Sequence, residues 1–201
     1  MERDDWQRRV AHSVGRQVNR LRNSKQPKVS AQQLADECSR IGSTISRSTI
    51  AKLESGTRAF VTLDEVLVMA FALDVPPVLL IAAVGTREDT EVLPGRQLAS
   101  WDAARWIAGA FSIEEVDGSL SAHDAGEDDL IVRFYLHEEL VQEILDTGPS
   151  EGYKDGSGKI VRMRRVLIDH LRADRAQMRR EGIVPPSLPA DLRHLDDQRA
   201  T

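Results

Sequence analysis

The chain has 201 residues, of which 41% are hydrophobic and 29% charged, so it can bury one ordinary hydrophobic core and a second small one. Its single cysteine, Cys38, excludes an internal disulfide and a multi-cysteine zinc site, and its best apolar run, residues 75–84, is too short to span a membrane. The net charge of −5 is unevenly spread, because residues 6–58 hold 11 Lys or Arg against three acidic residues, whereas residues 85–201 hold 15 against 23.

The first predicted element is a helix over residues 6–23. Apolar side chains recur in this range at spacings of three or four residues, with arginines between them, at Val10, Val14, Val18 and Leu21. The helix is therefore apolar on one side and basic on the other. Turn residues and Pro27 end the pattern.

A second, short helix is predicted to begin after Ser30 and to extend to Ile41. Gln33 stands at the third position after Ser30, where it completes a capping box. The inward side of this helix carries Leu34, Ala35 and Cys38. We expect Cys38 to be a small core residue rather than a redox sensor, since it lies on the apolar face. A polar turn follows at residues 42–45.

A third helix is predicted to begin after Ser46, whose hydroxyl can accept hydrogen bonds from the backbone amides of the first turn. Ile50 and Leu53 face the core, and Gly56 supplies the left-handed residue that ends the helix. The outward positions are Arg47, Ser48, Ala51 and Lys52. Arg and Lys can donate hydrogen bonds to guanine edges or phosphate, and Ser can donate or accept one. Ala has a small side chain that allows close approach, so this face suits a DNA groove. Residues 30–56 thus have the pattern of a helix-turn-helix.

A fourth helix is predicted at residues 63–73, with Thr62 as its cap and Glu65 as the partner in a capping box. The side chains that we expect it to bury are Val66, Leu67, Met69, Ala70 and Leu73. A fifth helix is predicted at residues 76–84. Its two prolines stand at the start, where a helix tolerates proline in the first turn. Five helices would then form a first domain over residues 1–84.

The rest of the chain is predicted to hold a linker at residues 85–97, a mostly helical region at 98–182 and an irregular tail at 183–201, so the fold class is mainly α. Within the helical region we expect a helix at 98–111, an acidic loop at 114–129, a strand-like start running into a helix at 130–145, a flexible break at 148–158 and a basic helix at 160–180.

Two groups of apolar side chains in this region each allow two interpretations. Trp101 and Trp106 either anchor its packing or mark a partner surface. The basic helix carries an apolar stripe that either packs within its own domain or forms a dimer seam, at Met163, Leu167, Leu171 and Met178.

Residues 14–84 resemble the lambda-repressor-like, Xre-type family of helix-turn-helix regulators. The resemblance rests on four segments: Leu34-Ala35, residues 45–50, residues 53–56 and residues 63–77. It implies a five-helix DNA-binding domain whose third helix enters the major groove. It also implies that bases are read by Arg47, Ser48 and Lys52, and that Ser46 caps the helix and contacts phosphate. Glu54 is implied to pair with Arg22 of the first helix, and this pairing is structural. Gly56 also has a structural role, because it ends the third helix.

The other expected DNA contacts are Arg58, Thr49 and Gln32. Arg58 follows the third helix, where phosphate contact is expected. Gln32 would replace the glutamine that the family usually has at the start of the second helix, where this chain has Ala31. The turn is also longer than the common pattern, through residues 39–44, and in this it resembles a group of actinobacterial regulators. A bias of 22 Arg over five Lys fits a GC-rich host.

The function expected from these residues is that of a sequence-specific DNA-binding transcriptional regulator, acting as a repressor. A basic surface joined to an acidic body fits a double-stranded DNA partner, although two merely solvated halves would have the same charges. A homodimer is expected because one short recognition helix contacts few base pairs. The C-terminal part would control dimerisation or receive a protein or small-molecule signal. The N-terminus lacks the apolar run of a signal peptide, so we expect a cytoplasmic, nucleoid-associated protein with no membrane partner.

Two alternatives stay open. An antitoxin of a toxin-antitoxin operon would also bind DNA, with its C-terminal part covering the toxin. A protein-interaction adaptor could use the same helical bundle without binding DNA.

We expect no catalytic residue, cofactor or metal site. Some repressors cleave themselves at an Ala-Gly bond, and Ala108-Gly109 is such a dipeptide, but the candidate bases, Lys154 and Lys159, lie in a Gly-rich break without the strand-rich domain that would align them. The five histidines are scattered. We expect His137, beside two glutamates, to belong to a helix-surface cluster rather than to a metal site.

Overall fold

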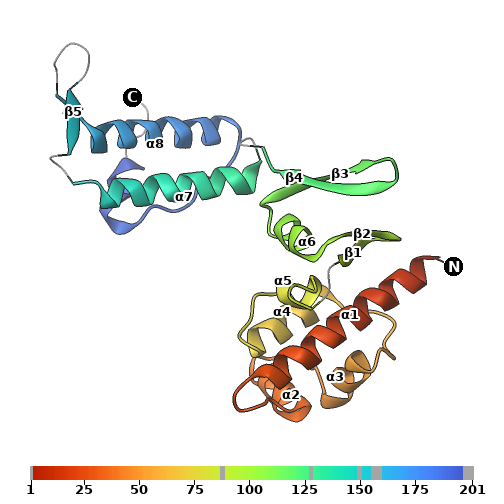
Figure 1. Cartoon of the computed structure of the whole chain (residues 1–201). Helices are drawn as coiled ribbons and strands as arrows, with labels where there is room; N and C mark the ends of the chain where they lie inside the picture. Colours follow the sequence, from red (N-terminus) through yellow and green to blue (C-terminus); the bar gives the residue numbers. More distant parts are fainter. Residues whose placement is uncertain (1, 87–88, 127–128, 149–150, 155–159, 197–201) are drawn as a thin grey trace. The chain divides into compact units, whose positions relative to one another are not determined.

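The structure, a computed structural model, describes residues 2–86, 89–126, 129–148, 151–154 and 160–196. Over these ranges the chain forms eight α-helices, one 3-10 helix and three two-stranded antiparallel sheets, so it is mostly helical with small sheets added (Figure 1). None of the helices in these ranges is long and apolar enough to cross a membrane. The chain divides into two compact units, residues 1–124 and 125–201, and each has a core of its own.

Unit 1 begins with the helices α1 (Glu2–Ser24), α2 (Ala31–Arg40), α3 (Arg47–Glu54), α4 (Leu63–Ala72) and α5 (Val78–Ile81). Their apolar sides meet in one core, whose largest fully buried members include Val14, Val18, Leu34, Ile50, Leu53 and Met69. On α1 the buried residues recur every three or four positions, which places them on one side of the helix. The first four helices lie close to the ranges that the spacing of apolar residues predicts.

The predictions for α4 and α5 need two corrections. Leu67 is 48% exposed rather than buried, and it forms an outer stripe with Leu63 and Phe71, four residues away on either side and each 68% exposed. α5 is about one turn long and ends well before residue 84, because Ala82 takes an extended backbone conformation with ψ of 131°. Its apolar end still contributes to packing, since Ala82 is fully buried.

Two hairpins and a short helix complete unit 1. They are β1 (Asp89–Leu93), β2 (Arg96–Ala99), α6 (Ser100–Ile107), β3 (Phe111–Val116) and β4 (Ser119–Asp124). The expected linker at 85–97 therefore contains β1 and the start of β2, the expected helix at 98–111 is shortened at both ends by strands, and the acidic loop at 114–129 contains most of a hairpin. Positive φ angles at Gly95 (70°), Asp117 (50°) and Gly118 (79°) make the two tight turns.

Unit 2 contains α7 (Leu130–Asp146), β5 (Gly152–Lys154), β6 (Ile160–Arg162), α8 (Met163–Arg180) and the 3-10 helix η1 (Ala190–Leu195). α7 and α8 pack against each other, and Arg133 near the start of α7 pairs with Glu181 at the end of α8, so the two helices are antiparallel (Figure 1). Their core includes Ile144, Leu171, Leu188, Leu192 and Leu195.

Several expectations for unit 2 are corrected. The start of α7 is helical rather than strand-like, because Asp129 caps it by accepting from the amide of Ile131. The break at 148–158 contains β5, and residues 155–159 lie outside the described ranges. The basic helix begins at Met163, after β6. The tail is not irregular throughout, since η1 buries two leucines, although residues 197–201 lie outside the described ranges.

Candidate nucleic-acid interface

Polar caps fix the ends of α2 and α3. The Ser30 hydroxyl accepts from the amide of Gln33 at 3.1 Å, while the Gln33 side chain accepts from the amide of Ser30 at 2.8 Å, which is the predicted capping box. The Ser46 hydroxyl accepts from the amide of Thr49 at 3.2 Å, as predicted for the cap of α3. Gly56, at φ of 72°, ends α3 in the left-handed conformation. The local sequence thus sets the start of both helices and the end of α3.

α1 braces the inner side of α3 through a close approach of two backbones. A Cβ atom built on Gly15 would lie 2.1 Å from the carbonyl oxygen of Leu53, so only glycine allows this helix crossing. One turn before Gly15, His12 lies against the end of α3, because a Cβ on Gly56 would lie 2.9 Å from the His12 ring. α3 therefore rests on α1 with little freedom to shift.

The expected pair between Glu54 and Arg22 is present. Arg22 donates from Nε and Nη2 to the two carboxylate oxygens at 2.6 and 2.7 Å, and Asn19 donates to the same carboxylate at 2.7 Å. Arg22 also donates to the carbonyl of Val29, which follows α1. Both charged side chains are mostly buried, at 15% and 11% exposure for Arg22 and Glu54. The pair therefore ties α3 to α1 in a fixed geometry.

The environment of Glu54 keeps its carboxylate ionised. Burial by itself would raise the pKa of Glu54, but the hydrogen bonds from Arg22 and Asn19 and the charge of Arg22 outweigh burial and lower the pKa below the ordinary value. The negative charge that anchors α3 is therefore present at neutral pH.

The outer side of α3 is exposed and its two cationic groups are free within the described part of the chain. Arg47, Ser48, Ala51 and Lys52 are all exposed. Neither Arg47 nor Lys52 has a side-chain hydrogen bond or an ion pair with any described residue, whereas Ser48 contacts only the hydroxyl of Ser46, at 2.8 Å. These side chains are available to a ligand outside the unit.

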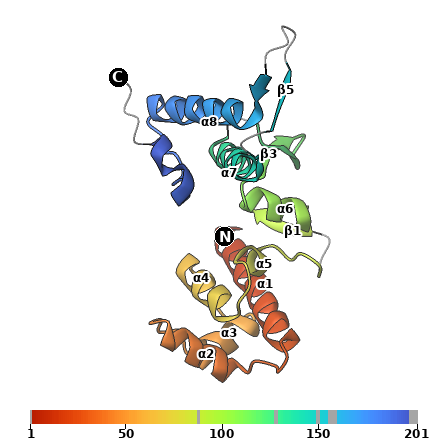
Figure 2. The same ribbon diagram turned by 90° about the vertical axis from the view of Figure 1, so that its left-hand side faces the viewer.

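An open groove lies between α2 and α3, which are neighbours in both ribbon views (Figures 1 and 2). Its lining residues are Gln32, Ala35, Asp36, Ser39, Ile45, Ser46, Arg47, Ser48 and Ala51. Four of the predicted DNA contacts line this groove: Gln32, Ser46, Arg47 and Ser48. Lys52 lies farther along the exposed side of α3 and does not line it.

Three of the predicted contacts, Gln32, Thr49 and Arg58, have structural partners. Gln32 donates from its amide to the Asp36 carboxylate at 2.8 Å, so it lies along α2. Thr49 is half-buried, and its hydroxyl lies 3.0 Å from that of Ser46. Arg58 donates to Glu65 at 2.7 Å with its side chain 20% exposed. Arg58 therefore orients the start of α4 and has less freedom to contact phosphate than Arg47 has.

Three residues of this region were missed by sequence reasoning. Gly15 could have been noticed as a glycine inside a helical pattern, which commonly has a packing reason. Asn19 lies one helical turn from Arg22, so it shares the face that meets Glu54. Asp36 lies one turn after Gln32 and introduces an acceptor into the groove, although nothing in its spacing distinguishes it from a solvated carboxylate.

The expectation for His137 is wrong, because this residue is 2% exposed and belongs to the core of unit 2. Its Nε2 atom lies 2.7 Å from Nη1 of Arg175, a buried guanidinium that also donates to both oxygens of Asp196 and to the carbonyl of Pro186. Burial lowers the pKa of His137 and the charge of Arg175 lowers it further. The imidazole is therefore neutral and accepts from Arg175.

The residues of the possible self-cleavage site belong to different parts of the chain. Ala108 and Gly109 form the end of α6 in unit 1, Lys154 is in β5 of unit 2, and Lys159 lies outside the described ranges. Cys38 is fully buried, and burial raises the pKa of its thiol, which fits the core role predicted for it. Among the described residues no three His, Cys, Asp or Glu side chains are grouped as metal ligands.

The two tryptophans of α6 differ in environment, since Trp101 is 63% exposed and Trp106 is half-buried. On α8, Leu167, Leu171 and Met178 are buried within unit 2. Met163, the first residue of the expected seam, is 37% exposed. Most of the stripe is therefore used for packing inside its own unit.

No protein-family model matches the chain, and neither the curated proteins nor the solved structures that were compared with it show a significant match.

Proposed function

We propose that the chain is a sequence-specific DNA-binding transcriptional regulator of the lambda-repressor-like type, and that α3 enters the major groove. One observation carries this proposal: the outer side of α3 presents Arg47 and Lys52 without partners among the described residues, while its inner side is fixed to α1. A rigid helix with free donors on its outer side is what direct reading of base edges requires.

The roles of the side chains follow from their positions. Arg47, at the first position of α3, is placed to donate two hydrogen bonds to the edge of a guanine. Ser48 adds a short polar contact, and Lys52, one turn later, reaches a neighbouring base or a phosphate. Asp36 in the adjacent groove offers an acceptor suited to the amino group of cytosine. Ser46 remains engaged as the cap of α3 and positions the others.

We further propose that the regulator acts as a homodimer in the cytoplasm, associated with the nucleoid, and that it represses transcription. α3 has eight residues, so one copy can contact only a few base pairs, and a second half-site supplies the missing specificity. α7 of unit 2 exposes an apolar group suited to pairing with another copy, consisting of Leu130, Ile131, Tyr135 and Leu136.

Binding of the full chain to duplex DNA over a salt series tests the proposal. We expect a shifted band that resists competition by unrelated duplexes, with log K falling by about 0.9 for each tenfold rise in salt and each phosphate neutralised. Binding that is equally strong for every duplex would contradict sequence reading. No binding at any salt concentration would favour the protein-interaction adaptor.

A further inference from the structure

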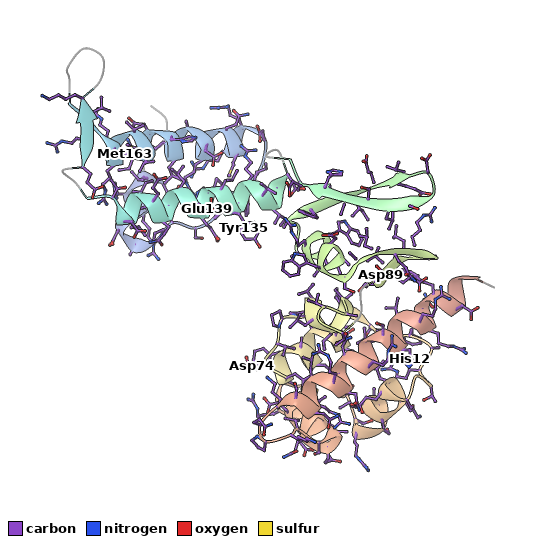
Figure 3. The ribbon with its side chains drawn as sticks, viewed as in Figure 1. His12, Asp74, Asp89, Tyr135, Glu139 and Met163 are labelled. Carbon is purple, nitrogen blue, oxygen red and sulfur yellow. The ribbon has the colours of Figure 1, made fainter. Side chains whose placement is uncertain are left out.

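A cavity of about 390 Å³ lies within unit 1, between α1 and the hairpin formed by β1 and β2. Trp6, Val10, Ser13 and Arg16 line it from α1, at spacings of three or four residues that place them on one face of the helix. Figure 3 labels one lining residue from each side, His12 on α1 and Asp89 at the start of β1. The volume falls at the small end of the range of about 300–1,000 Å³ found for small-molecule sites.

The apolar part of the lining includes two indole side chains. Trp6 of α1 and Trp106 of α6 both line the cavity, and both are half-buried. The other apolar side chains come from four different segments, at Val10, Ile81, Val92 and Ile107. Two indole rings on the wall of a small cavity favour a planar aromatic ligand, because such a ligand can stack on an indole or meet its edge.

The charges of the lining balance one another. Arg9 donates to both carboxylate oxygens of Glu91, at 2.7 and 2.8 Å. The charges of Arg9 and Glu91 therefore neutralise each other, and the pair joins α1 to β1. Arg16 and Asp89 add one further charge of each sign. The lining therefore favours an uncharged ligand over an anion or a cation.

We propose that this cavity is a binding site for an uncharged planar aromatic molecule of one or two rings. The site is separate from the outer side of α3, and the proposal does not depend on DNA binding.

Calorimetric titration of the full chain with 2-naphthol, in the absence of DNA, tests the proposal. Decahydro-2-naphthol is the matched probe, because it has the same skeleton and hydroxyl but no aromatic ring. We expect saturable binding of one 2-naphthol per chain, and at least about tenfold weaker binding of the saturated probe. Absence of saturable 2-naphthol binding, or equal affinity for the two probes, would overturn the proposal.

Variants locate the binding within the cavity. Trp106→Ala removes one aromatic wall, and Ser13→Phe fills the space from α1 without removing any packing, so each should weaken 2-naphthol binding by at least about tenfold. Trp101→Ala is the control, because Trp101 is on the same helix as Trp106, is 63% exposed and does not line the cavity. Circular dichroism confirms that each variant is folded. Unchanged binding by folded Ser13→Phe would contradict the assignment of the site.

Discussion

At the scale of single residues, the central distinction is between side chains that position α3 and side chains that remain free. Glu54 and Arg22 are engaged with each other and mostly buried, whereas Arg47 and Lys52 are exposed and have no partner among the described residues. Substitutions of Glu54 or Arg22 should therefore lower the free energy of unfolding, whereas substitutions of Arg47 or Lys52 should change DNA recognition.

Arg47→Ala should relax the sequence preference at one base pair. The loss of a bidentate contact to guanine is expected to reduce discrimination there by about 1–3 kcal/mol while discrimination elsewhere in the site is kept. Competition binding with a panel of single-base variants of a bound duplex measures this change. Arg180→Ala, on α8 of unit 2, is the matched loss of one arginine and should leave the preference intact. Uniform weakening across the panel would show that Arg47 contacts phosphate only.

Glu54→Gln should destabilise unit 1 by about 1–3 kcal/mol at pH 7, since the buried Arg22 loses its charged partner. The pKa of Glu54 is lowered in the folded state, so its contribution is complete above the ordinary pKa of 4.5 and is lost as the pH falls through the folded-state pKa. The difference between variant and parent should therefore shrink below pH 4.5.

Urea unfolding monitored by tryptophan fluorescence at several pH values measures this difference, because all three tryptophans are in unit 1. Glu37→Gln provides the comparison, since Glu37 pairs with Arg40 on the exposed side of α2 and such pairs contribute little. A constant gap between Glu54→Gln and the parent down to pH 3 would mean that the charge of Glu54 is not what stabilises the contact.

At the scale of elements, the position of α3 depends on the close crossing with α1. Gly15→Ala would place a methyl group 2.1 Å from the carbonyl oxygen of Leu53, so α3 must move away from α1. We expect a loss of about 1–3 kcal/mol in unfolding free energy and weaker DNA binding by the folded fraction. Chemical denaturation and band-shift titration measure the two effects.

Gly126→Ala is the control for this substitution, because a Cβ at Gly126 would meet no atom within 4 Å. Gly15→Ala protein with the stability and DNA affinity of the parent would show that the crossing tolerates a side chain and does not set the position of α3.

The parts of the fold that follow from local chemistry were predictable from the sequence. The Ser30 capping box, the Ser46 cap and the left-handed Gly56 each depend on residues within one helical turn, and these features set the start of α2 and both ends of α3. The side of α4 that faces solvent was predicted less well, because Leu67 is apolar and only the packing of the other helices leaves it outside.

The hairpins of unit 1 were missed although the sequence held a signal for one of them. Asp117-Gly118 between β3 and β4 is the dipeptide most typical of a two-residue hairpin turn, and both residues have positive φ. The acidic composition of the surrounding segment favoured a loop instead. The cavity beside β1 could not be predicted, since it requires Arg9 of α1 to meet Glu91 of β1, 82 residues later along the chain. The burial of His137 likewise requires Arg175, 38 residues later.

At the scale of the whole molecule, unit 2 is proposed to bring two DNA-binding units together. Ile131 and Tyr135 lie one turn apart on α7 and are 44% and 53% exposed. The double substitution Ile131→Glu and Tyr135→Glu should convert a dimer to a monomer, because it places charge in an apolar contact. Light scattering coupled to size exclusion measures the mass.

Glu139→Gln is the control, one turn beyond Tyr135 on α7, and both positions are labelled in Figure 3. It should leave the dimer intact. A parent protein that is monomeric at all concentrations would contradict the dimer but not the reading of single half-sites by α3.

Selection of bound duplexes from a randomised library tests directly whether α3 reads DNA, when the full chain is compared with the triple variant Arg47→Ala, Ser48→Ala and Lys52→Ala. We expect the full chain to enrich a sequence built from two related half-sites separated by one helical turn, about 10 base pairs, or a multiple of it. We expect the folded triple variant to enrich no sequence. If the parent enriches none, or if the triple variant enriches the same sequence, then α3 does not read DNA.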